Sequence, residues 1–255
     1  MRTFFLTIIF LFEIIFSEAQ ISREEIKKYY IYKITEKSFK GDSLTEVSAS
    51  YFDKTGNIIK GVSGRLTEIT TDTFYYENDR LKKTINFDFE HMTEYFYNPD
   101  GSYMTITTAK YFGAKNYFWF NEKGDILKAS AGGDTILYKY NEKGKLVSMR
   151  SQGNNQETKF NVEYTYNEKN QLIKVEMPKD EFNNTTETYK YDSDGKRTKA
   201  TQRTILHGIT RNRVTTYKYN KKGLLVKEIT IDTRKRNKKT STKNVYEYEF
   251  YGDKN

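Results

Sequence analysis

Side chains that could support catalysis are few and far apart in this sequence. The two histidines, His91 and His207, lie in different stretches of the chain, and no cysteine is present. The segment Gly61-Val62-Ser63-Gly64 lacks the G-x-S-x-G spacing that exposes a nucleophilic serine. Glu247 and Glu249 would share one face of a strand, which favours a polar surface over an acid–base couple. We therefore expect a protein that is not an enzyme and has no cofactor.

A possible metal site is confined to Asp192-Ser193-Asp194-Gly195, which resembles the start of a calcium-binding loop. The acidic ligands that should follow are missing, because Lys196, Arg197 and Lys199 occupy the next positions. Asp residues also cap tight turns through their own backbone N–H groups, and this explains the segment without an ion. We expect no metal here.

The densest run of charge is Arg234, Lys235, Arg236, Lys238 and Lys239, interrupted only by Asn237. It lies in a connection between two expected strands. Such a loop tip either contacts an anionic polymer, in a salt-sensitive manner, or is ordinary solvated charge. The first alternative makes these five residues candidate binding residues.

The only tryptophan, Trp119, lies in the aromatic segment Tyr117-Phe118-Trp119. Its ring and that of Tyr117 could stack on sugar rings, or they could form part of the core. Both residues are candidate binding residues under the first alternative.

A short phrase recurs eight times along the chain: an aromatic residue, Asn or Asp, two polar residues, and Gly. Asn98-Pro99-Asp100-Gly101 is its clearest form, because Pro and Asp suit the centre of a type I turn and Gly takes the left-handed position that closes a three-residue hairpin loop. In one copy Asn170 replaces Gly, and Asn also tolerates positive φ. The aromatic anchors are Phe52, Tyr76, Tyr97, Phe120, Tyr140, Tyr166, Tyr191 and Tyr219.

The turn geometry predicts which residues pair across each hairpin. Tyr140 should face Leu146, Tyr166 should face Leu172, and Tyr219 should face Leu225, as aromatic–aliphatic pairs that stabilise a sheet. Arg197 interrupts this pattern opposite Tyr191; we expect its stem to lie over the ring and its guanidinium to reach water.

The flanking segments alternate with a period of two and are rich in Tyr, Val and Thr, which is typical of strands. Neither face of these strands is wholly polar. Successive anchors are 20 to 28 residues apart, enough for two strands and their connections. The sequence therefore predicts an all-β protein of repeated antiparallel β-hairpins that form one long curled or coiled sheet.

Residues 1–19 have the pattern of a signal peptide: a basic Arg2, an apolar run from Phe4 to Phe16, and small residues before Gln20. The expected mature chain, 20–255, is a single β-repeat domain with no further membrane span, and its repeats are clearest from about 50 to 226. We expect it in the periplasm, at the cell surface or outside the cell. The net charge of the full sequence, +9, is compatible with anionic partners, although Lys in turns also serves solubility.

The phrases at 138–146, 189–195 and 217–225, each beginning Tyr-Lys-Tyr-Asn/Asp, resemble the YD-repeat (RHS-repeat) family. Members of that family build strips of hairpins that coil into shells and serve in toxin delivery, adhesion and carbohydrate binding, and the repeats are not catalytic. This chain has too few repeats for a toxin-enclosing shell.

Two classes of function follow from these observations. The first is an exported or cell-surface interaction module that binds a carbohydrate, an anionic polymer or a protein partner. The second is a structural or accessory protein, such as a chaperone or immunity-type partner of another gene product. No specific nucleic-acid binding is expected. Exposed aromatic rows would favour the first class, and buried aromatic rows with a polar exterior the second.

Overall fold

The computed structural model describes residues 23–65, 68–86, 91–109, 114–153, 158–180, 183–233 and 239–252. A short helix, α2 (Arg23–Lys28), precedes eighteen strands. The strands are β1 (Ile31–Lys40), β2 (Ser43–Phe52), β3 (Ile58–Arg65), β4 (Glu68–Glu77), β5 (Arg80–Asn86), β6 (His91–Tyr97), β7 (Tyr103–Ala109), β8 (Ala114–Phe120), β9 (Ile126–Ala131), β10 (Asp134–Tyr140), β11 (Leu146–Gln152), β12 (Thr158–Tyr166), β13 (Leu172–Asp180), β14 (Asn183–Tyr191), β15 (Arg197–Leu206), β16 (Ile209–Tyr219), β17 (Leu225–Thr233) and β18 (Lys239–Phe250).

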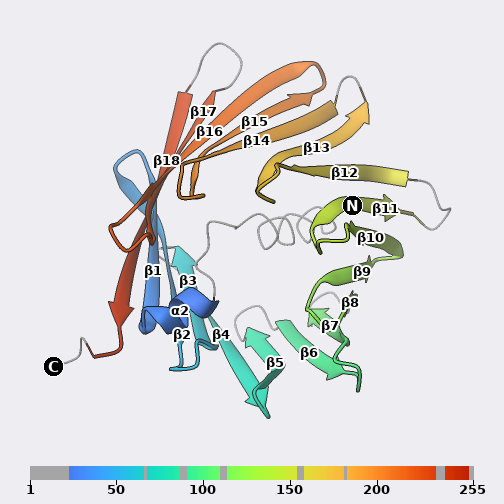
Figure 1. The fold of residues 1–255 in the computed structure, drawn as a ribbon, viewed down its shortest axis with the longest axis vertical. Coiled ribbons are helices and arrows are strands. Elements are labelled where there is room, and N and C mark those ends of the chain that lie inside the picture. Colours follow the sequence, from blue (N-terminus) through green and yellow to red (C-terminus); the bar gives the residue numbers. More distant parts are fainter. Residues whose placement is uncertain are drawn as a thin grey trace.

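Every strand pairs antiparallel with the next one along the chain, and β1 pairs with β18 as well as with β2. The sheet is therefore a closed barrel of eighteen strands, seen as a ring in Figure 1. The all-β antiparallel prediction is confirmed, but the expectation of a curled or coiled open sheet is wrong. Closure satisfies the backbone groups that two free edges would leave unpaired.

The repeated phrases form the expected tight turns at one end of the barrel. In the turn after β6, the Asn98 N–H donates to the Ser102 carbonyl at 2.8 Å and the Gly101 N–H to the Asn98 carbonyl at 3.0 Å. Gly101 has a φ of +88°, and Asn170, which replaces Gly in its copy, has a φ of +59°. The positive φ explains why the phrase ends on these two residue types.

The copy that follows Tyr76 is shorter than the others. Asn78 and Asp79 have φ angles of +51° and +59°, and they join Glu77 directly to Arg80. This is the two-residue hairpin loop with positive φ at both central positions, for which Asn and Asp are favoured.

The predicted cross-hairpin pairs are confirmed in register. Tyr140 lies opposite Leu146, Tyr166 opposite Leu172 and Tyr219 opposite Leu225, in each case with a bulge next to the pair. Tyr191 lies opposite Arg197, the exception seen in the sequence.

The anchor tyrosines also connect neighbouring hairpins, which the sequence pattern did not reveal. Each hydroxyl donates to the backbone carbonyl of the residue that lies opposite the preceding anchor. These bonds run from Tyr76 to Ile58 (2.9 Å), Tyr97 to Leu81 (2.9 Å), Tyr140 to Ile126 (2.8 Å), Tyr166 to Leu146 (2.9 Å), Tyr191 to Leu172 (2.7 Å) and Tyr219 to Arg197 (2.9 Å). Tyr248 of β18 makes the same contact with Leu225 (2.6 Å). A phenylalanine would pack equally well but could not donate, so the anchor role favours Tyr. At Phe120 the ring instead stacks on Tyr103, with centroids 4.4 Å apart.

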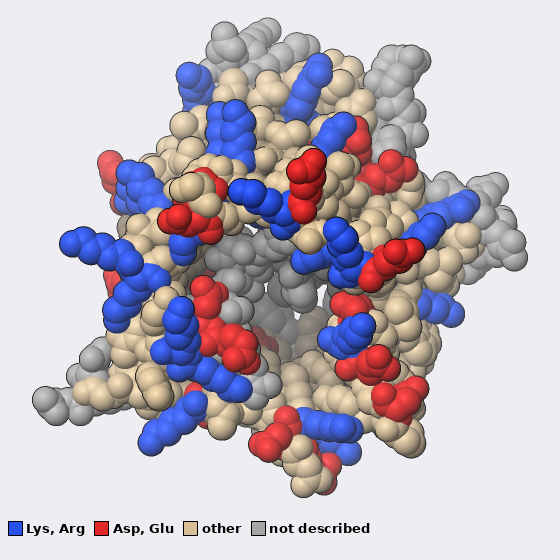
Figure 2. Space-filling view, in the orientation of Figure 1, with Lys and Arg blue, Asp and Glu red and all other residues tan. Residues whose placement is uncertain are grey.

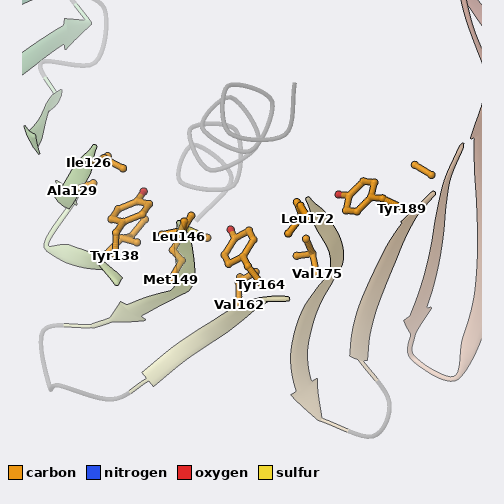
Figure 3. Packing of buried hydrophobic residues seen from close by; sticks show 12 residues of the cluster. Ile126, Ala129, Tyr138, Leu146, Met149, Val162, Tyr164, Leu172, Val175 and Tyr189 are labelled. Carbon is orange, nitrogen blue, oxygen red and sulfur yellow. The ribbon is translucent and has the colours of Figure 1, made fainter. Parts of the chain in front are cut away.

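The largest buried cluster lies on the inward side of strands β9 to β15 (Figure 3). Tyr138, Tyr164 and Tyr189 project from β10, β12 and β14 toward the inside of the ring, with Val162 and Leu172 beside them. A second, smaller cluster joins Ile26 of α2 to Ile31, Phe52 and Leu224, so α2 is packed at the turn end of the barrel.

In the part of the chain that the structure describes, no helix has both the length and the apolar character that a membrane crossing requires. The expected signal peptide, residues 1–19, lies outside the described residues and stays a prediction.

Candidate functional site: the hollow interior

The described strands enclose a cavity, which is lined by residues of β1 to β6 and β14 to β18. The cavity has a volume of about 1780 Å³ and runs along the whole height of the wall, from Lys40 and Thr240 at one end to Gly56 and Arg80 at the turn end. Figure 2 shows the molecule hollowed at its centre, with acidic and basic side chains around the opening. An eighteen-stranded barrel is wide enough to leave such a space, whereas side chains fill an eight-stranded one.

Strand alternation decides which side chains reach the cavity. On β1, the residues that line the cavity are Ile34, Glu36 and Ser38. Lys33 and Lys37, on the opposite face of the strand, point outward and form ion pairs with β18. Successive side chains of a strand point to opposite faces of a sheet, so one face becomes the lining and the other the exterior.

The lining changes in character from one end to the other. Near the turns it is largely aromatic and aliphatic, with Phe52, Tyr97, Leu225 and Tyr248, and Asp79 and Arg80 lie at its rim. Farther from the turns it becomes polar, with hydroxyls, amides and charged groups. The polar lining residues on β15 to β18 are Gln202, Arg211, Arg213, Thr215, Glu228, Thr230, Asp232, Thr240, Thr242 and Asn244.

Arg197 is a buried cation at the boundary between these two regions. Its side chain is only 5% exposed, and its guanidinium lies 4.2 Å from the ring centroid of Tyr189 and 6.0 Å from that of Tyr191. The expectation that its stem lies against the Tyr191 ring agrees with this position, but the expectation that its head reaches water is wrong. The inward face encloses the guanidinium, and cation–π contacts are strongest where water is excluded.

Two carboxylates, one on β14 and one on β17, interact with this cation. Burial raises the pKa of Glu187 above its ordinary value, and a hydrogen bond with Tyr189 and the charge of Arg197 only partly offset this rise. Burial likewise raises the pKa of Glu228, against hydrogen bonds with Tyr246 and Asn244 and the charge of Arg197. Desolvation disfavours the charged form of each acid, and the hydrogen bonds and the Arg197 charge favour it.

A second polar group lies farther from the turns. The Arg211 guanidinium donates from Nε to both carboxylate oxygens of Asp232 at 2.8 Å, and its terminal nitrogen contacts the same carboxylate. Arg213, two residues along the same face, lies 3.8 Å from Asp232. One carboxylate therefore serves two guanidinium groups, and Arg213 makes the longer contact.

The cavity is nearly neutral although the chain is basic. Its described lining contains six acidic and five basic side chains: Glu36, Glu46, Asp79, Glu187, Glu228 and Asp232 against Lys40, Arg80, Arg197, Arg211 and Arg213. The net charge of +9 therefore comes from residues outside this set.

The tyrosines of the lining remain hydrogen-bond donors at neutral pH. Burial is the main cause that raises the pKa of Tyr217 to about 12, and the charge of Glu228 raises it further. The pKa of Tyr246 is raised too, by burial first and by the charges of Glu228 and Glu36. The Tyr246 hydroxyl donates to Glu36 at 3.4 Å.

Tyr117 and Trp119 do not lie in the cavity or in the core. Phe118 and Phe120 of the same strand pack against the inward cluster, so the alternate residues face outward, where both are partly exposed. Their rings are stacked, with centroids 6.1 Å apart, and Lys128 lies 4.9 Å from the Trp119 ring. The core alternative is therefore wrong for these two residues.

Other apolar side chains surround this pair. Met104 is directly opposite Trp119 in register, and Phe96 is opposite Met104. Phe96 is 46% exposed, and Leu137, on the other side of Lys128, is 41% exposed. We call Phe96, Met104, Tyr117, Trp119 and Leu137 the outer aromatic patch.

The remaining sequence candidates are less informative. Residues 234–238 of the basic run lie outside the described residues, and Lys239 is exposed at the start of β18. Asp192 accepts the backbone N–H of Lys196 at 2.8 Å, which is the turn-capping role expected without an ion.

The sequence analysis missed the charged residues of the cavity. A signal was present: counting back in steps of two from the anchor Tyr219 gives Tyr217, Thr215, Arg213 and Arg211, all on the anchor's face. Charged residues on the same face as buried anchors indicate either a covered polar network or a lining in contact with water.

Comparison with known proteins yields similarity in fold only. The sequence matches no family model and no curated protein. A porin-like protein from Bacteroides uniformis has a TM-score of 0.53, with 13% identity, over 86% of this chain and 98% of its own. A porin-like protein from Bacteroides vulgatus has a TM-score of 0.32, with 14% identity, over 88% of this chain and 99% of its own. The TcdB2-TccC3 complex without its hypervariable C-terminal region (15% identity) has a TM-score of 0.40, over 78% of this chain and 12% of its own.

The class of protein that the fold and the cavity define is a closed, antiparallel all-β barrel with a hollow, polar interior.

Proposed function

We propose that this protein is an exported, non-catalytic binding module whose hollow interior holds the ligand. The observation that carries the proposal is the lining: guanidinium, carboxylate, amide and hydroxyl groups from neighbouring strands converge on one cavity of about 1780 Å³. Polar groups turned toward an enclosed space need hydrogen-bonding partners, and a polar ligand can supply them. Convergent polar groups in a concave space are typical of ligand sites.

The exterior supports a barrel surrounded by water in the cell envelope or outside the cell. Lys33 and Lys37 form ion pairs at 2.6 Å with Glu249 and Glu247 on the outward face, where all four are partly exposed or exposed. Charged side chains on the outward face of a barrel destabilise it in a bilayer, by about 2–4 kcal/mol for each Lys at the midplane. The signal-peptide pattern at residues 1–19 supports export.

We also propose that the hairpin unit is a YD repeat. The Tyr-x-Tyr-Asn/Asp phrase, its closing Gly and its position at one end of the sheet support this relationship. In this chain the repeats close on themselves, and the tyrosine of each phrase hydrogen-bonds to the preceding hairpin.

A second candidate is an interaction module that binds a protein partner at the outer aromatic patch and not a ligand in the cavity. Exposed Phe96 and Leu137 beside partly exposed Trp119 form a surface of the composition found at protein interfaces. A protein partner bound there would leave the cavity free.

Site-directed labelling distinguishes the two candidates. The chain has no cysteine, so Ser48→Cys in the cavity and Ala49→Cys on the outward face of the same strand each provide one thiol. Ligand in the cavity should slow the reaction of the Ser48→Cys variant with a polar maleimide and leave that of the Ala49→Cys variant unaffected. The probes are a neutral oligosaccharide, an acidic oligosaccharide and a fatty acid. Equal labelling with every probe would contradict the proposal.

N-terminal sequencing of protein from the native host tests cleavage near Gln20.

A further inference from the structure

We infer that the interior takes an extended, uncharged, polyhydroxylated chain, a linear neutral oligosaccharide, in preference to an anionic polymer or an acyl chain. This inference rests on the proposed binding function of the cavity. It goes further because it names the chemistry of the ligand from the charge, hydrogen-bonding groups and shape of the lining.

The charge of the lining disfavours an anionic ligand. Its described residues carry one more acidic than basic side chain, and the two guanidiniums of Arg211 and Arg213 already face Asp232. A polyanion in the cavity would lie close to Glu187 and Glu228, whose side chains are half-buried. Like charges repel, and the repulsion is stronger beside half-buried groups than between groups in bulk water. The basic net charge of the chain therefore does not predict the charge of this ligand.

The hydrogen-bonding groups suit a partner that both donates and accepts. Arg213 has guanidinium donors, and its contact with the Asp232 carboxylate is long, at 3.8 Å. Gln202 and Asn244 add amides that donate and accept, and Glu228 adds an acceptor. Vicinal hydroxyls of a sugar can satisfy donors and acceptors that lie side by side, which an acyl chain cannot do. An acidic sugar has such hydroxyls too, but it would add carboxylates near Glu187 and Glu228.

The aromatic lining supplies the complementary surface. Tyr217, Tyr246 and Tyr248 line the cavity between the polar region and the turn end. The C–H faces of pyranose rings are apolar and pack against aromatic rings, whereas their edges carry the hydroxyls. An acyl chain would match only the turn end, and along the rest of the cavity it would desolvate charged groups.

The shape of the cavity indicates a chain and not a single sugar. Lining residues extend from Lys40 at one end of β1 to Arg80 beside the turns. A ligand that contacts both the Arg213 region and the Tyr248 region must span several strand positions. Affinity should therefore increase with the number of sugar units until the cavity is filled.

Calorimetric titration of the full mature chain tests the inference. The probes are neutral linear oligosaccharides of two, four and six or more units, an oligogalacturonate of matched length, and dodecanoate. The variants are Glu228→Gln and Arg213→Gln in the cavity. Their matched controls are Glu249→Gln and Arg203→Gln, which make the same chemical changes on the outward face. We expect length-dependent binding of a neutral probe, weakened about tenfold or more by each cavity variant and less than twofold by each control.

The other outcomes overturn the ligand class, the cavity as the binding site, or both. Binding of oligogalacturonate or dodecanoate alone, sensitive to the cavity variants, would overturn the ligand class and leave the cavity as the binding site. Binding that ignores both cavity variants would overturn the cavity itself. Absence of binding by every probe would overturn both claims. If Glu228→Gln fails to fold, as judged by circular dichroism, the Arg213→Gln comparison still decides.

Discussion

The hydroxyl of Tyr251 donates a 2.5 Å hydrogen bond to the backbone carbonyl of Phe52, across the junction where the two ends of the sheet meet. Like the bonds between successive hairpins, it joins a tyrosine hydroxyl to a backbone carbonyl beside a turn. Its acceptor differs, because Phe52 is an anchor that precedes its turn, whereas the other acceptors follow theirs. The junction therefore has a related but separate hydrogen bond.

Removing one of these hydroxyls should destabilise the barrel. We expect Tyr76→Phe to lower the free energy of unfolding by about 1 kcal/mol, because the Ile58 carbonyl loses its donor. Urea unfolding measures the change. The control is Tyr75→Phe, the preceding residue on β4, which is 44% exposed and faces outward. Equal losses in the two variants would argue against the role of the anchor hydroxyl.

The turn glycines should tolerate Asn better than Ala. Gly144 has a φ of +71°, and an added Cβ would meet no atom within 4 Å, so backbone conformation alone penalises a side chain there. We expect Gly144→Ala to cost about 1–2 kcal/mol and Gly144→Asn clearly less, since Asn170 adopts the same conformation in its turn. Thermal unfolding of both variants checks the order. The reverse order would contradict this explanation.

The buried carboxylates should make stability fall as pH rises. Burial raises the folded-state pKa of Glu187 and of Glu228 above 4.5, so the folded protein binds more protons than the unfolded chain at pH values just above 4.5. Their contribution to stability is therefore fully present below pH 4.5 and is lost as pH rises through the folded-state pKa values.

Urea unfolding between about pH 4 and 7 measures this effect. The double variant Glu187→Gln/Glu228→Gln should lose stability less steeply over that range than the parent protein. Glu247→Gln/Glu249→Gln on the outer face is the control. A double variant with the parent's slope would show that these two acids do not set the pH dependence.

Arg197 should be required chiefly when its acidic neighbours are ionised. Arg197→Leu places opposite Tyr191 an aliphatic residue like those opposite Tyr140, Tyr166 and Tyr219. It also removes a cation that favours the charged forms of Glu187 and Glu228. Removing one partner of a buried ionic group typically costs about 3–5 kcal/mol. We expect a loss of this size near neutral pH and a smaller loss in acid, both measured by urea unfolding. Adding Glu187→Gln and Glu228→Gln should recover most of the stability; no recovery would show that packing alone explains the loss.

The local features of this fold could be predicted because their causes are local. Turn positions follow from the φ requirement of residues such as Gly101 and Asn170. The register of Tyr140 with Leu146 follows from the length of the loop between them. These properties depend on short stretches of neighbouring residues, and the sequence by itself determines them.

Closure and the character of the interior were decided only by the tertiary structure. Whether β18 meets β1 depends on the curvature and tilt that accumulate over eighteen strands. The sequence of one hairpin does not reveal that sum. Both faces of the strands contain apolar and charged residues, so period-two patterning could not decide which face is enclosed. Closure buried Arg197 and aligned it with carboxylates from β14 and β17, and it turned Trp119 outward. The sequence determined the repeating unit, and the geometry of the closed ring determined which side chains face the hollow.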